Sequence, residues 1–540
     1  NQDASLWPAE EHDTESIKNN LRWLELPRQM PAVIAHISQR AAILKDGIDH
    51  IVFVGMDGSN LAAATILKIS ATDLDKKIHL LDTTDPNALR ELESLLIVER
   101  TVFVFTEKSG TRIETHALLL YFLHKLKSSG TPVPGRHFVA ITEADSYLAN
   151  LGKEYKFRDV FFDPPGIHSR FSGLIHFVFM LSAICNVNEL EIMENIKAMT
   201  EACSSADMLA NPAAVLAAFL AAGEVHGLHR LIILSPEELT YFAHRIAQLV
   251  GASTAGEKRG FIPIFGQPLS SLKLTKNCLV INLKMKNRPS NMPDEAPQFA
   301  ALEIPVVEIE LDRATDFSGE IFKWEIATVL ACAALQLNPF RDVHDPGSSR
   351  IPAARLENIV RKREAFLPTE RVKENGISLY VETSTRREIS TLSLRAALRT
   401  FLELRNPDGY IAILPFFGAR NHLASLQTIR DRIGHALAIP VQIVSGPGYL
   451  RTLGTVYKCG PAHGIFILLT ADPEEDIPIP GAGYAFGDLQ LALAQQELEE
   501  LRNSDRCVIR LHFYQGAGKG LQQFSDIMDH ALMHVRGHAG

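Results

Sequence analysis

The chain has 540 residues, of which 46% are hydrophobic and 22% charged, and its net charge at pH 7 is −9. These proportions are ordinary for a globular protein, and the length allows two to four domains. The acidic balance argues against binding to nucleic acid, since no basic block offsets it. No apolar run reaches the roughly 18 residues of a membrane-spanning helix. We therefore expect neither nucleic acid nor membrane as a partner.

The six cysteines are far apart in the sequence and show no metal-ligand spacing. We expect reduced thiols, a cytoplasmic location, no metal and no cofactor. The first residues lack the basic and apolar parts of a signal peptide. Because residue 1 is not methionine, we also expect upstream sequence to be missing. The cysteines are Cys185, Cys203, Cys278, Cys332, Cys459 and Cys507.

Residues 1–48 are expected to form an N-terminal helical segment. From 49 to 180, short apolar runs alternate with helical patterns, which predicts a parallel sheet covered by helices. The strands expected in this first α/β domain are 51–54, 78–81, 101–105, 137–141 and 159–162.

A second α/β domain is expected over 181–340, and a charged, helix-bearing linker over 341–387. A smaller C-terminal α/β domain is expected over 388–540. The strands predicted in these domains are Leu231–Leu234, Cys278–Leu283, Val306–Ile309, Ile411–Leu414, Val441–Val444, Ile465–Leu469 and Val508–Phe513. The helices predicted near the C-terminus are 422–436, 487–502 and 519–535.

Small turn residues follow two of the buried strands in the first domain. Such a turn, placed between a strand and a helix, offers backbone N–H groups, hydroxyls and a lysine charge to an anion. A single turn of this kind often only caps a helix, but the pair at this separation favours a phosphate site. The residues predicted to contact the ligand in these loops are Gly58, Ser59, Lys108, Ser109 and Thr111.

The two loops resemble the phosphate loops of sugar isomerase (SIS) domains, specifically those of phosphoglucose isomerase. Three further motifs carry the resemblance: Pro164–Ser172, Phe322–Thr328 and Asn338–Phe340. Towards the ends of the chain, 6–8, 22–27 and 446–450 are similar to the isomerase half of bacterial transaldolase–phosphoglucose isomerase fusions.

The resemblance implies an α/β fold of two tandem SIS-type doubly wound parallel-sheet sandwiches, plus a smaller C-terminal α/β domain. It also implies a glutamate base, a histidine and a lysine for ring opening, and an arginine beside the enediolate. Arg170 matches that arginine, and Gln248 matches a glutamine one helical turn before the base. The base position, however, is Ala252, and Arg451 stands where the histidine is expected. Neither side chain can move a proton at neutral pH.

Two further departures concern the lysine and the phosphate loops. The segment after Phe340 has Asp342 and His344 but no lysine where the family has one. Asp57 and Glu107 place carboxylates in the loops, where they would repel a phosphate. We expect Arg112 either to pair with Glu107, which would fill the site, or to capture an anion itself.

Three functions are therefore left open. The first is a catalytically inactive homologue that acts as a structural or regulatory sugar-phosphate-binding subunit. The second is an active isomerase with relocated acid/base residues, for which Glu257 is one candidate base. The third is a pure protein-interaction module. The C-terminal domain is expected to bring Arg451 towards the cleft, and the chain is expected to form a homodimer or a hetero-oligomer with another sugar-phosphate enzyme.

Overall fold

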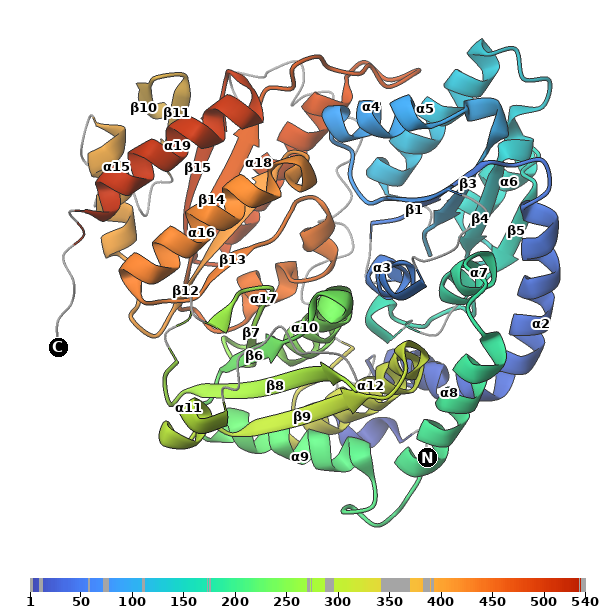
Figure 1. Cartoon of the computed structure of the whole chain (residues 1–540), viewed down its shortest axis with the longest axis horizontal. Helices are drawn as coiled ribbons and strands as arrows, with labels where there is room; N and C mark the ends of the chain where they lie inside the picture. Colours follow the sequence, from blue (N-terminus) through green and yellow to red (C-terminus); the bar gives the residue numbers. More distant parts are fainter. Residues whose placement is uncertain are drawn as a thin grey trace.

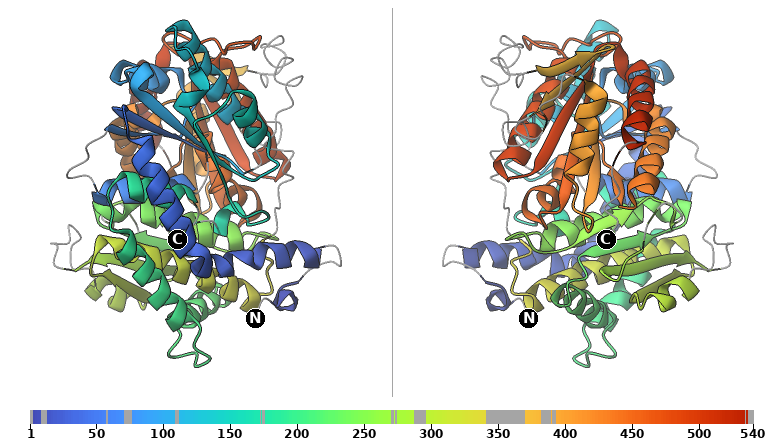
Figure 2. Two further views of the ribbon diagram at one scale, coloured as in Figure 1. Left: turned by 90° about the vertical axis from the view of Figure 1, so that its right-hand side faces the viewer. Right: turned by 90° about the vertical axis from the view of Figure 1, so that its left-hand side faces the viewer.

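In the part of the chain that it describes, the computed structural model contains three sheets, each flanked by helices (Figures 1 and 2). In Figure 1 the first sheet lies at the upper right, the second at the bottom and the C-terminal one at the upper left. No helix in the described part of the chain is long and apolar enough to cross a membrane. The structure describes residues 3–8, 13–56, 59–70, 77–108, 112–171, 173, 176–269, 272, 274–286, 296–340, 370–381, 389, 393–533 and 535.

The first sheet is parallel throughout and has the order β2-β1-β3-β4-β5. Its central strands are buried along their whole length because helices cover both faces. All five predicted strands are confirmed, each to within one residue at either end. The strands are β1 (His50–Val54), β2 (Lys77–Leu81), β3 (Thr101–Thr106), β4 (Phe138–Thr142) and β5 (Asp159–Phe162).

The second sheet is also parallel, with the order β7-β6-β8-β9. Its strands are β6 (Arg230–Leu234), β7 (Ile262–Phe265), β8 (Cys278–Met285) and β9 (Val306–Leu311). Three of them were predicted, whereas β7 was not. This strand is four residues long and contains Pro263, which a strand at the edge of a sheet tolerates.

The C-terminal sheet is mixed and has the order β10-β11-β15-β14-β12-β13. Its four predicted strands are parallel and confirmed. The strands are β10 (Glu370–Glu374), β11 (Ile377–Val381), β12 (Tyr410–Phe416), β13 (Val441–Ile443), β14 (Gly464–Ala471) and β15 (Cys507–Phe513).

The antiparallel hairpin β10–β11 corrects the predicted linker. Residues 341–369 lie outside the described part, but β11 within the predicted 341–387 linker pairs with β15 and is fully buried. The hairpin turns at Asn375 and Gly376, which both have positive φ, as the tightest hairpin turns require. The segment was predicted to be a linker because the residues of the edge strand β10 are mostly charged.

Three units of the chain share one strand order. In each sheet, the first four parallel strands in the sequence lie side by side in the order second, first, third, fourth. This order reverses direction between the first and third strands, and ligands of open α/β sheets bind at such a switch point. Apart from the corrected linker, the domain boundaries given above stay our prediction.

The helices cover these sheets and join them. Helix α12 packs against α8, α9 and α10, and α17 packs against α10. The short 3-10 helices used below are η5 (Ser169–Phe171) and η10 (Gly448–Arg451). The α-helices are α1 (Asp13–Asn20), α2 (Leu26–Leu44), α3 (Ser59–Ser70), α4 (Pro86–Leu95), α5 (Ile113–Ser128), α6 (Tyr147–Glu154), α7 (His176–Ile184), α8 (Glu189–Cys203), α9 (Pro212–Val225), α10 (Thr240–Thr254), α11 (Ala296–Ala301), α12 (Phe317–Ala334), α15 (Leu394–Glu403), α16 (Leu423–Leu437), α17 (Gly454–Cys459), α18 (Phe486–Asn503) and α19 (Gly516–Leu532).

Candidate functional site

The predicted arginine meets the predicted base position at the C-terminal half of α10. Arg170 lies in η5 and is buried, and its Nη1 donates to the backbone oxygen of Ala252 over 2.6 Å. Gln248, one turn earlier on α10, is fully buried. His168 contacts the same guanidinium, with 3.1 Å between its Nε2 and Arg170 Nη2. The arginine and glutamine of the isomerase pattern thus both lie at α10, where the base position is an alanine.

A buried ion pair holds the turn that carries Arg170. Arg245 Nη2 lies 3.0 Å from Glu325 Oε1 and also donates to the backbone oxygen of Arg170. Its Nη1 donates to Gln248 Oε1 over 3.0 Å. The same Glu325 oxygen accepts the N–H of Gly173 over 3.1 Å. Because so many bonds end on these two side chains, the backbone around Arg170 is fixed in place.

Glu325 was not singled out from the sequence as a site residue. Burial raises its pKa to about 7, while Arg245 and Lys108 act in the opposite direction. The only signal was a glutamate within the apolar run of α12, and its partner Arg245 lies 80 residues earlier in the chain. A pairing between two helices so far apart in sequence has no local pattern.

Glu107 fills the start of the helix after the second predicted phosphate loop. Its side chain is almost completely buried, and its Oε1 accepts the backbone N–H of Arg112, the residue before α5, over 2.6 Å. Burial raises the pKa of Glu107, and the nearby charge of Arg112 lowers it. A carboxylate therefore takes a hydrogen bond that a bound phosphate would accept at this helix terminus. Lys108, next in the chain, donates to the backbone oxygen of Ile167.

Several predicted site residues lie outside the part of the chain that the structure describes. Gly58, Ser109 and Thr111 lie outside the described residues, as do Asp57, Asp342 and His344. Ser59 begins α3, but its side chain is outside the described part. Their role in binding a phosphate stays a prediction.

The C-terminal domain does reach α10. The backbone of Arg451 ends η10, and its side chain is outside the described part. The following helix, α17, packs so closely on α10 that a Cβ at Gly251 would lie 2.9 Å from a methyl of Val456. Lys258 donates its N–H to the backbone oxygen of Cys459 over 3.1 Å. The segment after Arg451 is thus placed against the helix that carries Ala252.

Glu257 is badly placed to replace the missing base. Helix α10 ends at Thr254, and Glu257 is exposed in the following turn with a φ of 53°. In the described part of the chain, no group of three or more His, Cys, Asp or Glu side chains is arranged to hold a metal ion.

The fold is that of phosphosugar isomerases. A glucose-6-phosphate isomerase from Chlamydia trachomatis superposes on 66% of this chain and 78% of its own, with a TM-score of 0.51 and 16% identity. A hypothetical protein from Thermus thermophilus covers 64% of this chain and 91% of its own, with a TM-score of 0.53 and 16% identity. No known family profile matches the chain.

Sequence comparison supports the relationship independently. The chain is 27% identical over 273 residues to the glucose-6-phosphate isomerase of Carboxydothermus hydrogenoformans, covering 48% of this chain and 59% of that protein. It is 27% identical over 251 residues to a probable glucose-6-phosphate isomerase from Haloquadratum walsbyi, covering 44% and 57%. The match thus spans under two thirds of these relatives' lengths. The chain is a relative of the glucose-6-phosphate isomerases, as its motifs predicted.

Proposed function

We propose that this chain is a catalytically inactive relative of glucose-6-phosphate isomerase that acts as a structural or regulatory subunit. The observation that carries the proposal is the surroundings of Ala252. The position expected to hold the base has a methyl group, and its backbone oxygen accepts the hydrogen bond of Arg170. Aldose–ketose isomerisation needs a group that moves a proton between C1 and C2, and alanine offers none.

Binding of a sugar phosphate is a second part of the proposal. Lys108, Arg170 and Gln248 would supply the cations and the amide for it, together with the undescribed loop residues. Glu107 opposes it, since a carboxylate at the start of α5 repels a phosphate at short range. We therefore expect a sugar phosphate to be bound more weakly than in an active isomerase and to be sensed rather than converted.

A coupled assay of glucose 6-phosphate and fructose 6-phosphate interconversion tests inactivity. We expect no turnover at a sensitivity of about 10⁻⁴ of an ordinary kcat, which is about 1–10³ s⁻¹. The double variant Ala252→Glu, Arg451→His should gain measurable turnover, and Ala252→Gln with Arg451→His is the control of matched size without a base. Turnover by the natural chain in the ordinary range would overturn the proposal.

An active isomerase with a relocated base is the second candidate, and Glu325 is the observation in its favour. A carboxyl with a pKa of about 7 beside the turn of Arg170 has the property of a general base. Against this role, its Oε1 already accepts two hydrogen bonds and its side chain is 1% exposed. Turnover in the natural chain that Glu325→Gln abolishes would favour this candidate.

A pure interaction module is the third candidate. Thermal-shift titration with glucose 6-phosphate separates it from the first, because only a binding subunit gains stability from the ligand. The homodimer and the hetero-oligomer with another sugar-phosphate enzyme stay predictions. Light scattering on the purified chain, alone and with such an enzyme, tests them.

A further inference from the structure

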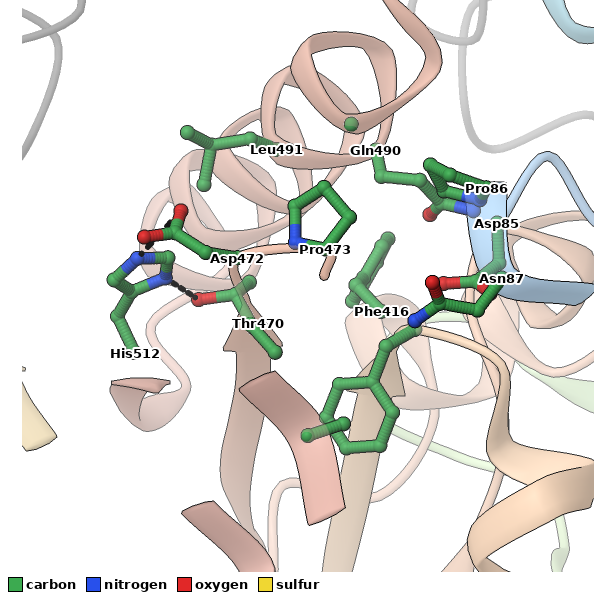
Figure 3. Close-up of a pocket in the computed structure, with 14 residues that line it drawn as sticks. Asp85, Pro86, Asn87, Phe416, Thr470, Asp472, Pro473, Gln490, Leu491 and His512 are labelled. Atoms are coloured by element: carbon green, nitrogen blue, oxygen red, sulfur yellow. Dashed lines mark hydrogen bonds and ion pairs between the residues drawn. The ribbon is translucent and has the colours of Figure 1, made fainter. Parts of the chain in front are cut away.

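A hollow opens in the C-terminal domain at the place where its sheet changes direction (Figure 3). Phe416 ends β12 and Phe417 follows it, while Thr470 lies at the end of β14 and the loop after it contributes Asp472 and Pro473. Since β12 and β14 are the first and third strands of this unit, the hollow lies at its switch point. The predicted phosphate loops of the first sheet follow its first and third strands in the same way.

The first domain closes the other side of this hollow. Asp85, Pro86 and Asn87, at the start of α4, face Phe416 and Thr470 across it (Figure 3). The contact is close, because a Cβ at Gly418 would lie 2.7 Å from Asp85 Oδ1. A molecule bound in the hollow would therefore touch two domains at once.

The polar lining has unused hydrogen-bonding capacity. Gln490, on α18, is 4% exposed, and neither its amide nitrogen nor its amide oxygen has a partner among the described residues. Asp85 uses Oδ1 to cap α4 at Ala88 N, and no described residue bonds its Oδ2. Burying an amide without hydrogen-bond partners costs free energy, so a ligand that bonds it recovers that cost.

The charges around the hollow exclude an anion. No described lysine or arginine lines it, and the lining includes the carboxylates of Asp85 and Asp472. At the start of α18, the N–H of Gly487 already donates to Asp476 Oδ1 over 2.8 Å. A carboxylate of the chain itself therefore takes a hydrogen bond that an anion would accept there. Asp472 in turn lies 3.4 Å from His512 Nε2, and His512 Nδ1 lies 3.0 Å from the Thr470 hydroxyl.

The size of the hollow limits how a ligand enters. The hollow has about 20 Å³ for the centre of a water-sized group. It thus accepts one hydroxyl-sized group, and the rest of a ligand would stay outside the hollow.

We propose that this hollow binds the hydroxyl-bearing end of a small uncharged sugar or polyol at the junction of the first and C-terminal domains. That hydroxyl would donate to Asp85 Oδ2 and accept from the Gln490 amide. This inference does not rest on the proposed function, because the site uses none of the residues around Ala252.

Calorimetric titration of the full chain tests the proposal, with D-glucose and sorbitol as uncharged probes. Inorganic phosphate and ethylammonium serve as anionic and cationic probes. We expect saturable binding of at least one uncharged probe below about 10 mM, and none of phosphate at this site. Gln490→Leu should weaken that binding at least about tenfold, the loss of one good polar contact. Gln496→Leu, on the same helix outside the hollow, should leave it unchanged.

A second variant covers the case in which Gln490→Leu does not fold. Asp85→Asn acts from the other domain and should also weaken binding, because an amide nitrogen replaces the oxygen proposed to accept from the ligand, while Arg170→Met beside Ala252 should not. Hydrogen exchange should slow in 470–473 and 486–491 when the probe is added. The proposal is wrong if neither uncharged probe binds, if ethylammonium binds here more tightly than they do, or if binding is lost in Arg170→Met and kept in Gln490→Leu.

Discussion

The first sheet and the C-terminal sheet share a strand order but differ at their switch points. After β3, the carboxylate of Glu107 is buried against the first residues of α5 and bonds the backbone of its own loop. After β14, a hollow remains, and Gln490 faces it with no partner in the described part of the chain. One site is filled by its own chain, whereas the other keeps polar groups unbonded.

The difference teaches that strand order alone does not decide where a ligand binds. The order creates a crevice in each unit, but the residues that end the strands decide whether it is occupied. The sequence motifs pointed to the first sheet because its loops resemble known phosphate loops. The C-terminal unit has no such motif and nevertheless has the open site.

The largest effect on stability is expected at the buried ion pair between Arg245 and Glu325, which holds the turn of Arg170. Arg245→Leu leaves Glu325 buried without its cation and should cost about 3–5 kcal/mol in the free energy of unfolding. The exposed pair Lys276–Glu303 is the control, since both side chains are at least three-quarters exposed. Lys276→Met should therefore cost less than about 1 kcal/mol in chemical denaturation. Equal losses in the two variants would contradict the role given to the buried pair.

The stability of the chain should depend on pH because two of its glutamates are buried. Burial raises the pKa of Glu325 and of Glu497 to about 7 from an ordinary 4.5. Between these pH values the folded chain binds more protons than the unfolded chain, so its stability should fall as pH rises from about 4.5 to 7. Each carboxyl contributes a slope of at most about 1.4 kcal/mol per pH unit. Glu325→Gln and Glu497→Gln should each flatten the melting-temperature profile, and unchanged slopes would refute this.

Opening the filled site should change its anion affinity. Glu107→Ser removes a carboxylate from the start of α5, and the affinity for inorganic phosphate should rise about tenfold or more, because repulsion at short range is lost. Asp472→Ser in the C-terminal hollow is the matched control and should not create phosphate binding. An unchanged affinity in Glu107→Ser would mean that the carboxylate is not what excludes the anion.

Two glutamines of α18 allow the stability effect of a hydrogen-bonded side chain to be compared with that of an unbonded one. Gln490 has no partner among the described residues, so Gln490→Leu should leave the stability of the ligand-free chain unchanged or raise it by up to about 1 kcal/mol. Gln495 accepts from Arg510 Nη1 over 3.2 Å, so Gln495→Leu should cost about 1–3 kcal/mol. Thermal melts compare the two, and a larger loss in Gln490→Leu would show that its amide is satisfied in solution.

The smallest effect is expected at the surface between the two regions. Arg420 pairs with Asp82 over 3.0 Å, and its side chain is 60% exposed. Arg420→Ala should cost about 0.2–1 kcal/mol and less at high salt, because water and ions screen the pair. Melting at low and high ionic strength measures this difference, and a loss independent of salt would point to packing instead.

Most strands could be predicted because they are apolar runs bounded by turn residues, as in β1 and β3. Three strands could not be predicted. Strand β7 contains a proline, and β11 belongs to the hairpin whose edge strand β10 is charged; both features are also typical of loops. The Asn375–Gly376 pair was a readable hairpin signal that the charged surroundings obscured.

The candidate site was predictable only where a motif exists. The resemblance located Arg170, Gln248 and Ala252, and the structure brings them together. It could not locate the pair Arg245–Glu325, which depends on the packing of α10 against α12. Gln490 looks like an ordinary polar residue of α18, and only the packed structure shows that it is buried without a partner among the described residues.

The packing of α17 on α10 has a consequence for genetics and enzymology. A cleft that is completed by another copy can be repaired by mixing two differently damaged chains, because some mixed assemblies contain one intact set of parts. Here Val456 and Gly251 touch within a single chain. Damage on α10 and damage on α17 should therefore not complement each other when carried by separate copies. Only a chain in which both helices are intact should therefore supply an intact α10–α17 contact.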